Sequence, residues 1–307
     1  MSNRGVKVPY TALKKKKRSV NAMFYYNEIE DSNGVIYSID MVRMNLEYTK
    51  QDTQRLCNWL SKYEDGGNII INYFESFKFL NYRHLWQIQC KYSDVVNKLC
   101  SFSLGMNFNG YKQENEKGFI EFNPNKCMNS KPFREIFEFI LNCCWKAEVK
   151  RYDLAIDFPT ARQNVRLVRD RRKYQLVENK GAVTEYLGIR NEGGFVKLYD
   201  KQKESDLNYV LTRLEITLDK EKTLENVFPE VYIVNPQLAL NDINNLNKTE
   251  MVLLELLQNC DTPDYYMRRL GKTMKNKLKN YLVYDNQFTY NQSIYRMLRV
   301  SLENYER

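Results

Sequence analysis

The sequence predicts an α+β protein with mainly antiparallel sheets, helices on one face of the sheet, and a basic helical module at its C-terminal end. Three observations predict this class. Most segments before residue 236 alternate apolar and polar residues with a period of two, as half-buried antiparallel strands do. An amphipathic helix after Ser130 carries an apolar stripe that can cover a sheet. From about residue 236 onward the composition becomes helical and basic.

Length and composition set the broad class. A chain of 307 residues with 43% hydrophobic residues can bury a substantial core, and it is long for a single domain. It shows no run of about 20 apolar residues and no secretory signal, so we expect a soluble, intracellular protein with no membrane partner. The net charge of +9 favours a polyanionic partner such as DNA. The chain is also rich in Lys, Asn, Tyr and Ile, as proteins of AT-rich genomes are, so composition alone favours a nucleic-acid partner only modestly.

Cysteine and histidine usage exclude several metal sites. The seven cysteines show no CxxC spacing, so we interpret them as reduced thiols that pack as small apolar residues. His84 is the single histidine, which excludes paired-histidine metal sites. Its surroundings favour a structural role in a half-buried strand over the role of a lone general base.

We divide the chain into three parts. Residues 1–35 form a basic N-terminal segment, residues 36–235 form the main domain, and residues 236–307 form a helical C-terminal module. A run of cations in the first part is expected to contact DNA phosphates as a solvated tail, with a nuclear-targeting signal as the alternative. The run consists of Lys14, Lys15, Lys16, Lys17 and Arg18.

The first half of the main domain is rich in strands. Residues 37–48 alternate, and a short helix then begins at Asp52 or Thr53. The apolar face of this helix consists of Leu56, Trp59 and Leu60. Aromatic and β-branched residues predict three further strands. These strands cover residues 69–80, 84–92 and 118–123.

The second half follows the clearest helix of the chain. Ser130 can cap this helix, and Pro132 lies in its first turn. Its apolar stripe consists of Phe133, Ile136, Phe137, Ile140, Leu141 and Cys144. The period then changes to two. The predicted strands are 149–158, then a hairpin of 184–190 and 195–201 after a charged insertion at 160–180, and finally 210–218.

The C-terminal module contains an apolar helix at 248–260 and a basic amphipathic segment after Pro263. That segment is either one helix or two helices split at Gly271. Its cations contact DNA, or the segment docks on the main domain with a solvated basic face. The candidate DNA contacts are Arg268, Arg269, Lys272 and Lys275.

Strand phase brings charged residues to one face of the sheet, because residues two apart in a strand share a face. In the strand at 149–158, Asp153 and Asp157 flank Ala155 on the face opposite the apolar one. Two carboxylates on one face repel each other unless cations or a metal offset their charge. If neighbouring strands put their apolar faces on one layer, the opposite face gathers further polar groups. These groups are Lys197, Tyr199, Lys201, Arg213 and Glu215.

Such a set suits chemistry on a phosphodiester. Its carboxylates favour Mg²⁺ or Mn²⁺ over zinc, and either ion would polarise the phosphodiester. The Tyr199 hydroxyl, whose unperturbed pKa is about 10, needs activation, which Lys197 or Lys201 could supply on the same face. A phosphotyrosine link conserves the bond energy, so a cut strand can be rejoined. The alternative is a salt-bridged, solvated sheet face.

A weak internal repeat links the two halves of the main domain. The strands that contain Asp40 and Asp153 each precede a Leu-Gly element and then a strand that begins with Gly-Phe. We interpret the repeat as a candidate duplicated β-α-β unit. In that alignment Asn123 takes the place of Tyr199, so the first half would be a scaffold without the tyrosine.

Three linked motifs resemble those of a known family. RYDLAIDF, YLGIRNEGGFVKLYDKQKE and TRLEI occur in this order over about residues 151–216. Together they are similar to the Rep-trans initiators of rolling-circle plasmid replication in Gram-positive bacteria, to which relaxases of conjugative transposons and phage-type initiators are related. The insertion between Asp157 and Tyr186 departs from the family pattern, and the N-terminal half matches only loosely.

The resemblance implies a tyrosine-dependent endonuclease that nicks and rejoins one DNA strand at an origin hairpin, in the bacterial cytoplasm. Tyr199 would be the nucleophile, and a carboxylate site of Asp153, Asp157 and Glu215 would bind Mg²⁺ or Mn²⁺. A homodimer and a host helicase partner are implied in the same way. Two alternatives stay open, namely an inactive DNA-binding module of the same fold and a divalent-metal nuclease that uses water.

Overall fold

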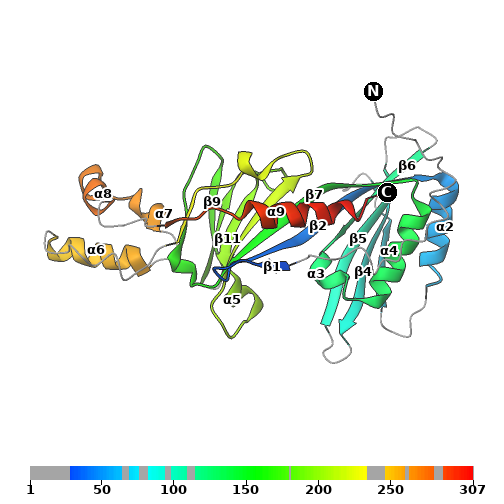
Figure 1. The fold of residues 1–307 in the computed structure, drawn as a ribbon, viewed down its shortest axis with the longest axis horizontal. Coiled ribbons are helices and arrows are strands. Elements are labelled where there is room, and N and C mark those ends of the chain that lie inside the picture. Colours follow the sequence, from blue (N-terminus) through cyan, green and yellow to red (C-terminus); the bar gives the residue numbers. More distant parts are fainter. Residues whose placement is uncertain are drawn as a thin grey trace, which may run out of the picture.

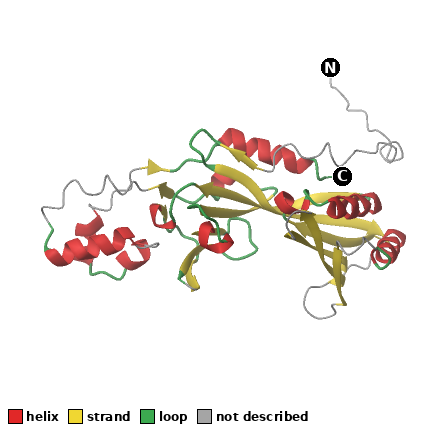
Figure 2. Ribbon diagram, turned by 90° about the horizontal axis from the view of Figure 1, so that it is seen from below, coloured by secondary structure: helices red, strands yellow, loops and turns green. Residues whose placement is uncertain are grey.

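A computed structural model shows the arrangement of the chain (Figure 1) and describes residues 28–63, 69–75, 82–93, 98–108, 115–179, 181–233, 246–259, 263–279 and 286–306. The predicted basic run that begins at Lys14 lies outside these residues. A large antiparallel sheet combined with helices confirms the predicted α+β class. In Figure 2, α4 (Lys131–Cys143) and α9 (Gln292–Glu303) lie on the same side of this sheet.

The described residues contribute 11 strands to the main sheet and three to a small second sheet. The main path has the order β3-β4-β5-β6-β2-β7-β12-β11-β10-β9, and β1 pairs with β2. The small sheet has the order β14-β13-β8. The bounds are β1 (Glu28–Glu30), β2 (Ile36–Thr49), β3 (Ile69–Glu75), β4 (Tyr82–Ser93), β5 (Lys98–Phe108), β6 (Asn115–Phe122), β7 (Lys146–Phe158), β8 (Val165–Leu167), β9 (Tyr174–Asn179), β10 (Ala182–Leu187), β11 (Val196–Asp200), β12 (Thr212–Asp219), β13 (Val231–Ile233) and β14 (Asn286–Gln287).

The main sheet consists of two halves with the same strand order. In each half a central strand is followed by a crossover to the far edge, from which the chain meanders back through antiparallel neighbours. The first half runs from β2 to β6 and crosses over through α2 (Lys50–Leu60). The second runs from β7 to β12 and crosses over through η2 (Arg162–Asn164) and β8. Since β2 and β7 pair antiparallel at the junction, β6 and β12 occupy equivalent places.

The two halves align residue by residue when Glu121 is matched to Glu215, and register then gives the other equivalent residues. Glu121 on β6 lies between β2 and β5 as Glu215 on β12 lies between β7 and β11. Two positions before each glutamate, Phe119 pairs with Gly105 in the first half and Arg213 pairs with Tyr199 in the second. Gly105 and Tyr199 are therefore equivalent. The sequence alignment of the repeat instead gave Asn123 this place. That alignment matched β6 to β11 and not to β12, because no strand had been predicted at the position of β5.

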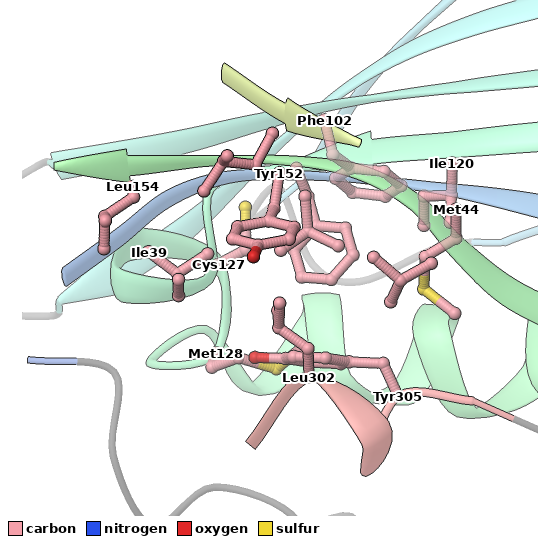
Figure 3. Packing of buried hydrophobic residues seen from close by; sticks show 14 of the residues in the cluster. Ile39, Met44, Phe102, Ile120, Cys127, Met128, Tyr152, Leu154, Leu302 and Tyr305 are labelled. Carbon is pink, nitrogen blue, oxygen red and sulfur yellow. The ribbon is translucent and has the colours of Figure 1, made fainter. Parts of the chain in front are cut away.

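Apolar residues of α2, α4 and α9 cover one face of the sheet and form the main core with it. Ser130 caps α4 as predicted, since its hydroxyl accepts a hydrogen bond from the Phe133 backbone N–H at 3.3 Å. Figure 3 shows Leu302 and Tyr305 lying against sheet residues that include Tyr152. Each fully buried apolar side chain contributes roughly 1.5–3 kcal/mol. The short segments α3 (Pro124–Cys127), α5 (Lys201–Ser205) and η3 (Leu224–Asn226) complete the helices of the main domain.

The first helix starts earlier than expected. Thr49 caps α2, because its hydroxyl accepts a hydrogen bond from the Asp52 backbone N–H at 3.1 Å. Asp52, which was expected to start the helix, therefore lies in its first turn, where a carboxylate is favourable. Leu56 and Leu60 are buried, as the predicted apolar face requires.

The region grouped as the C-terminal module packs in two places. α6 (Lys248–Asn259), α7 (Pro263–Met267) and α8 (Lys272–Lys279) share a small apolar cluster and lie at one end of the molecule (Figure 1). β14 and α9 return to the main domain instead, where α9 packs on the main core. Gly271 separates α7 from α8, which confirms the alternative with two helices. In the described part of the chain, no helix combines the length and the apolar character that crossing a bilayer would take.

Candidate active site

The face of the second half that lies opposite the main core carries the predicted polar residues. Cross-strand pairing places Arg213 opposite both Asp157 and Tyr199, and it places Lys197 opposite Glu215. Because directly paired residues point to the same face, these side chains share it. The predicted strand phase of β7, β11 and β12 is therefore confirmed.

A cavity of about 940 Å³ opens on this face, and we call it the Tyr199 cavity. Six of the seven residues predicted for catalysis or metal binding line it, while Asp157 does not. Residues from β2, β9, β10, α3 and α5 also contribute to its wall. The lining residues from the predicted set are Asp153, Lys197, Tyr199, Lys201, Arg213 and Glu215.

Tyr199, Glu215 and Lys197 form a hydrogen-bonded group in the cavity. The Tyr199 hydroxyl donates to Glu215 Oε1 at 2.5 Å, and Lys197 Nζ donates to Glu215 Oε2 at 2.5 Å. Burial, followed by the negative charge of Glu215, raises the pKa of Tyr199 well above its usual value. Burial opposes the charge of Lys197, but the attraction of Glu215 prevails and raises the pKa of the ammonium. At neutral pH the phenol therefore keeps its proton and the lysine its charge.

Arg213 and Asp157 form a two-pronged ion pair beside this group. Arg213 Nε and Nη2 donate to the two oxygens of Asp157, each at 2.6 Å. Arg213 Nη1 also reaches Asp40 Oδ1 at 3.2 Å, and Asn123 Nδ2 donates to the same oxygen at 2.9 Å. The pKa of Arg213 is raised because the pairing with Asp157 outweighs the effect of burial. The guanidinium is thus permanently charged and held in one orientation.

Asp153 stands apart from these pairs. Burial raises the pKa of its carboxyl, while a hydrogen bond from Thr217 and the charge of Lys197 act in the opposite direction. Its charge is therefore only partly compensated, and a cation in the cavity would stabilise it.

Lys201 reaches the cavity from a helix and not from the predicted strand. The side chain of Asp200 accepts a hydrogen bond from the Lys203 backbone N–H at 3.0 Å, which ends β11 and caps α5. The Lys201 ammonium pairs with Glu204 at 2.6 Å and lies 5.8 Å from the centre of the Tyr199 ring. Lys201 therefore lies near Tyr199 as predicted, but it does so from α5 and not from the same strand face.

The predicted metal ligands do not converge as a set of three. Among the described residues, no three acidic, cysteine or histidine side chains lie close enough to hold a metal ion. Asp157 fits least, because both of its oxygens accept hydrogen bonds from Arg213. Both oxygens of Glu215 are likewise engaged, by Tyr199 and Lys197. Asp153 lines the cavity and fits best, since Mg²⁺ is commonly bound by one or two carboxylates together with water and phosphate oxygens.

Strand phase alone did not identify Asp40 and Asn123 as site residues. The register of β2 shifts between Ile39 and Met41, and this β-bulge turns both Asp40 and Met41 toward the cavity. A bulge breaks the period of two, so alternation could not reveal it. The internal repeat was the available signal, because it singled out Asp40 and Asn123.

The equivalent face of the first half is built differently. Glu121 accepts from Arg43 at 3.1 Å and lies 3.7 Å from Arg151. The Phe119 ring fills the space over Gly105, so that a Cβ atom there would overlap the ring. The guanidinium of Arg43 lies over the Phe119 ring, 4.0 Å from the ring centre. The first half thus retains a glutamate but has neither the tyrosine nor room for one.

The basic helices of the small cluster present their cations outward. Arg268, Arg269 and Lys272 are exposed, and Lys275 is half-buried. Lys277 pairs with Glu250 on α6 at 2.7 Å. The exposed cations are available for phosphate contacts, and their predicted role in DNA binding stays a prediction.

Comparisons with known proteins give a distant structural likeness. No family model matches the chain, and a search of curated proteins found no relative. Among solved structures, a rolling circle replication initiator protein from Geobacillus stearothermophilus aligns with a TM-score of 0.34 and 13% sequence identity. The alignment covers 81% of this chain and 97% of that chain.

Proposed function

We propose that this chain nicks single-stranded DNA at a specific site and transfers the cut strand through a phosphotyrosine intermediate. The hydrogen bond from Tyr199 to Glu215, at 2.5 Å in an open cavity, carries the proposal. A nucleophile and a general base within hydrogen-bond reach are the arrangement that covalent catalysis requires. The linked motifs that resemble Rep-trans initiators support the same reaction.

The proposed step moves one proton and exchanges one bond. Tyr199 Oη attacks the phosphorus, and Glu215 takes the phenolic proton as the new O–P bond forms. The bond from phosphorus to a sugar oxygen breaks, and that oxygen takes a proton from solvent. In the reverse direction a free sugar hydroxyl attacks the phosphotyrosine, which returns Tyr199 and joins the strand. The raised pKa of Tyr199 makes this transfer to Glu215 necessary for attack at neutral pH.

The cations around Tyr199 would stabilise the charge that develops on the phosphoryl oxygens. Arg213 is fixed by Asp157 and Asp40, so it can serve without reorganising. Lys197 and Lys201 line the same cavity, each beside a glutamate. If Mg²⁺ or Mn²⁺ binds, Asp153 is the residue that would hold it, and the ion would polarise the phosphodiester.

The biological role that fits this reaction is the start of rolling-circle replication, or the mobilisation of a plasmid or other mobile element. The substrate would be an unpaired strand or an extruded origin hairpin. The exposed cations of α8 and the adjoining turn would add contacts to phosphates that do not depend on sequence. A homodimer and a host helicase partner stay predictions of the resemblance.

The test is covalent capture of DNA. The chain is incubated with Mg²⁺ or Mn²⁺ and a pool of labelled hairpin oligonucleotides with randomised single-stranded segments. The adduct is then separated on a denaturing gel and its DNA is sequenced. We expect an adduct with the natural chain, none with Tyr199→Phe, and an undiminished adduct with Tyr209→Phe, an exposed tyrosine that does not line the cavity. Cleavage that survives Tyr199→Phe with no adduct would favour the water-using nuclease, and binding without cleavage would favour the inactive module.

A further inference from the structure

The Tyr199 cavity has a second, aromatic end that the proposed reaction does not use. Tyr186 lies opposite Lys197 on one side and opposite Gln175 on the other, so it continues the row of Glu215 and Lys197 across β10. The rings of Tyr186 and Phe195 are stacked, with centroids 5.7 Å apart and planes 15° apart. Both rings line the cavity.

Phe195 and Tyr186 differ in how much of each ring is covered. Phe195 is 6% exposed and forms the floor, whereas Tyr186 is only half-buried. The Tyr186 hydroxyl has no hydrogen-bond partner among the described residues, and core packing does not require a hydroxyl there. Gly188 adjoins the pair, and a Cβ at this glycine would meet the Phe195 Cα at 3.3 Å. An aromatic platform is therefore open to a flat ligand beside the tyrosine nucleophile.

The position of this platform matches the size of one nucleotide. Tyr199 pairs with Thr184, so Tyr186 is its diagonal neighbour on the adjacent strand. Such diagonal neighbours lie about 7–8 Å apart, a span of the same order as that from a phosphate to the base of its own nucleotide. Lys173 and Arg190 line the same end, and both are exposed without a carboxylate partner in the described part of the chain. They suit the phosphate of the next nucleotide.

We propose that Tyr186, supported by Phe195, is a base-stacking subsite that holds the unpaired nucleotide adjoining the scissile phosphate. This inference rests on the proposed function and names the part of the substrate that the site grips. An aromatic face accepts any base, because every base has a π-face. The subsite thus selects single-stranded over paired DNA and orients the strand so that its phosphate faces Tyr199.

Binding without cleavage tests the subsite. Labelled oligothymidylate and an abasic oligomer of equal length and charge are titrated with the full chain in EDTA, and fluorescence anisotropy gives each Kd. We expect the natural chain to prefer oligothymidylate, and Tyr186→Ala to weaken that binding about tenfold while leaving the abasic Kd unchanged. Tyr186→Trp should keep the preference, and so should Tyr209→Ala, an exposed tyrosine outside the cavity.

The outcomes separate the subsite from the reaction. An equal loss for both oligomers in Tyr186→Ala would mean that the residue acts only through folding or charge, and it would overturn the subsite. No loss for oligothymidylate would overturn it as well. If either result accompanies an intact Tyr199 adduct in the natural chain, the proposed function stands and only the subsite is wrong. If the natural chain forms no adduct but Tyr186→Ala still loses base-dependent affinity, the subsite stands and the nicking reaction is wrong.

Discussion

In the second half of the main sheet, the open face carries a tyrosine, a lysine and a glutamate bonded to one another, while the first half keeps only the glutamate. Glu215 accepts from Tyr199 and from Lys197, whereas Glu121 accepts from Arg43. At the place of the tyrosine, the first half has Gly105 under the Phe119 ring. One strand order therefore serves two purposes. In the proposed function the second half supports chemistry, while the first extends the sheet and packs against α2 and α4.

This difference teaches that the position of a residue in the fold does not by itself make a site. The same strand order places a glutamate at equivalent positions in both halves. Only the neighbouring strands decide whether that glutamate meets a nucleophile or a structural cation. Because the two halves share a strand order, substitutions at equivalent positions can be compared, and each half serves as the control for the other.

The largest difference is expected for the two glutamates. Glu215→Gln removes the proton acceptor of Tyr199 and should slow adduct formation by about 10² to 10⁴. Glu121→Gln should leave the rate unchanged, because its carboxylate contacts arginines far from the nucleophile. Adduct formed over time on denaturing gels gives both rates. Equal losses in the two variants would remove the catalytic distinction between the halves.

The two arginine pairs should differ in stability. Arg213→Met leaves Asp157 buried without its partner, so the free energy of unfolding should fall by about 3–5 kcal/mol. The Arg213 side chain is 12% exposed and that of Asp157 is 6% exposed. Arg43 and Glu121 are each 28% exposed, and Arg43→Met should cost no more than about 1 kcal/mol. Urea unfolding measures both changes. A larger cost for Arg43→Met would show that the half without the nucleophile holds the stronger pair.

The smallest effect concerns the place of the missing tyrosine. Gly105→Ala forces the Phe119 ring to move, so it should cost about 1–3 kcal/mol of unfolding free energy. Most of this cost should disappear when Phe119→Ala is already present, because the obstructing ring is then gone. A double-mutant cycle in urea checks this coupling. Additive costs would mean that the backbone of β5, and not the Phe119 ring, excludes a side chain at this position.

Local patterns were enough to predict the part of the site that depends on strand phase. Alternation in 149–158, 195–201 and 210–218 placed Asp153, Tyr199 and Glu215 on one face, because the phase of a strand is a local property. Sequence could not show how the charges pair across strands. The bidentate contact between Arg213 and Asp157, which withdraws that aspartate from the predicted ligand set, depends on the register of two strands that are far apart in the chain.

Other differences have equally local causes. Asp200 caps α5 and so takes Lys201 out of the strand, because a side chain that bonds to the backbone competes with strand pairing. The apolar face of α9 predicts that the helix packs against other apolar residues. The pattern does not show whether α9 joins the main core, as it does, or the small cluster of α6, α7 and α8. The unrecognised strand β5 shifted the repeat alignment by one strand. The signal was present, since Cys100, Phe102, Leu104 and Met106 alternate with Ser101, Ser103 and Gly105 along this strand.

The most direct test of the central claim is to locate the DNA on the protein. The adduct formed by the natural chain is digested with trypsin and nuclease, and mass spectrometry finds the peptide that carries the residual nucleotide. The account predicts the modification on Tyr199, with none on Tyr186 or on any other tyrosine. A nucleotide found on a different residue, or an adduct that Tyr199→Phe still forms, would contradict it.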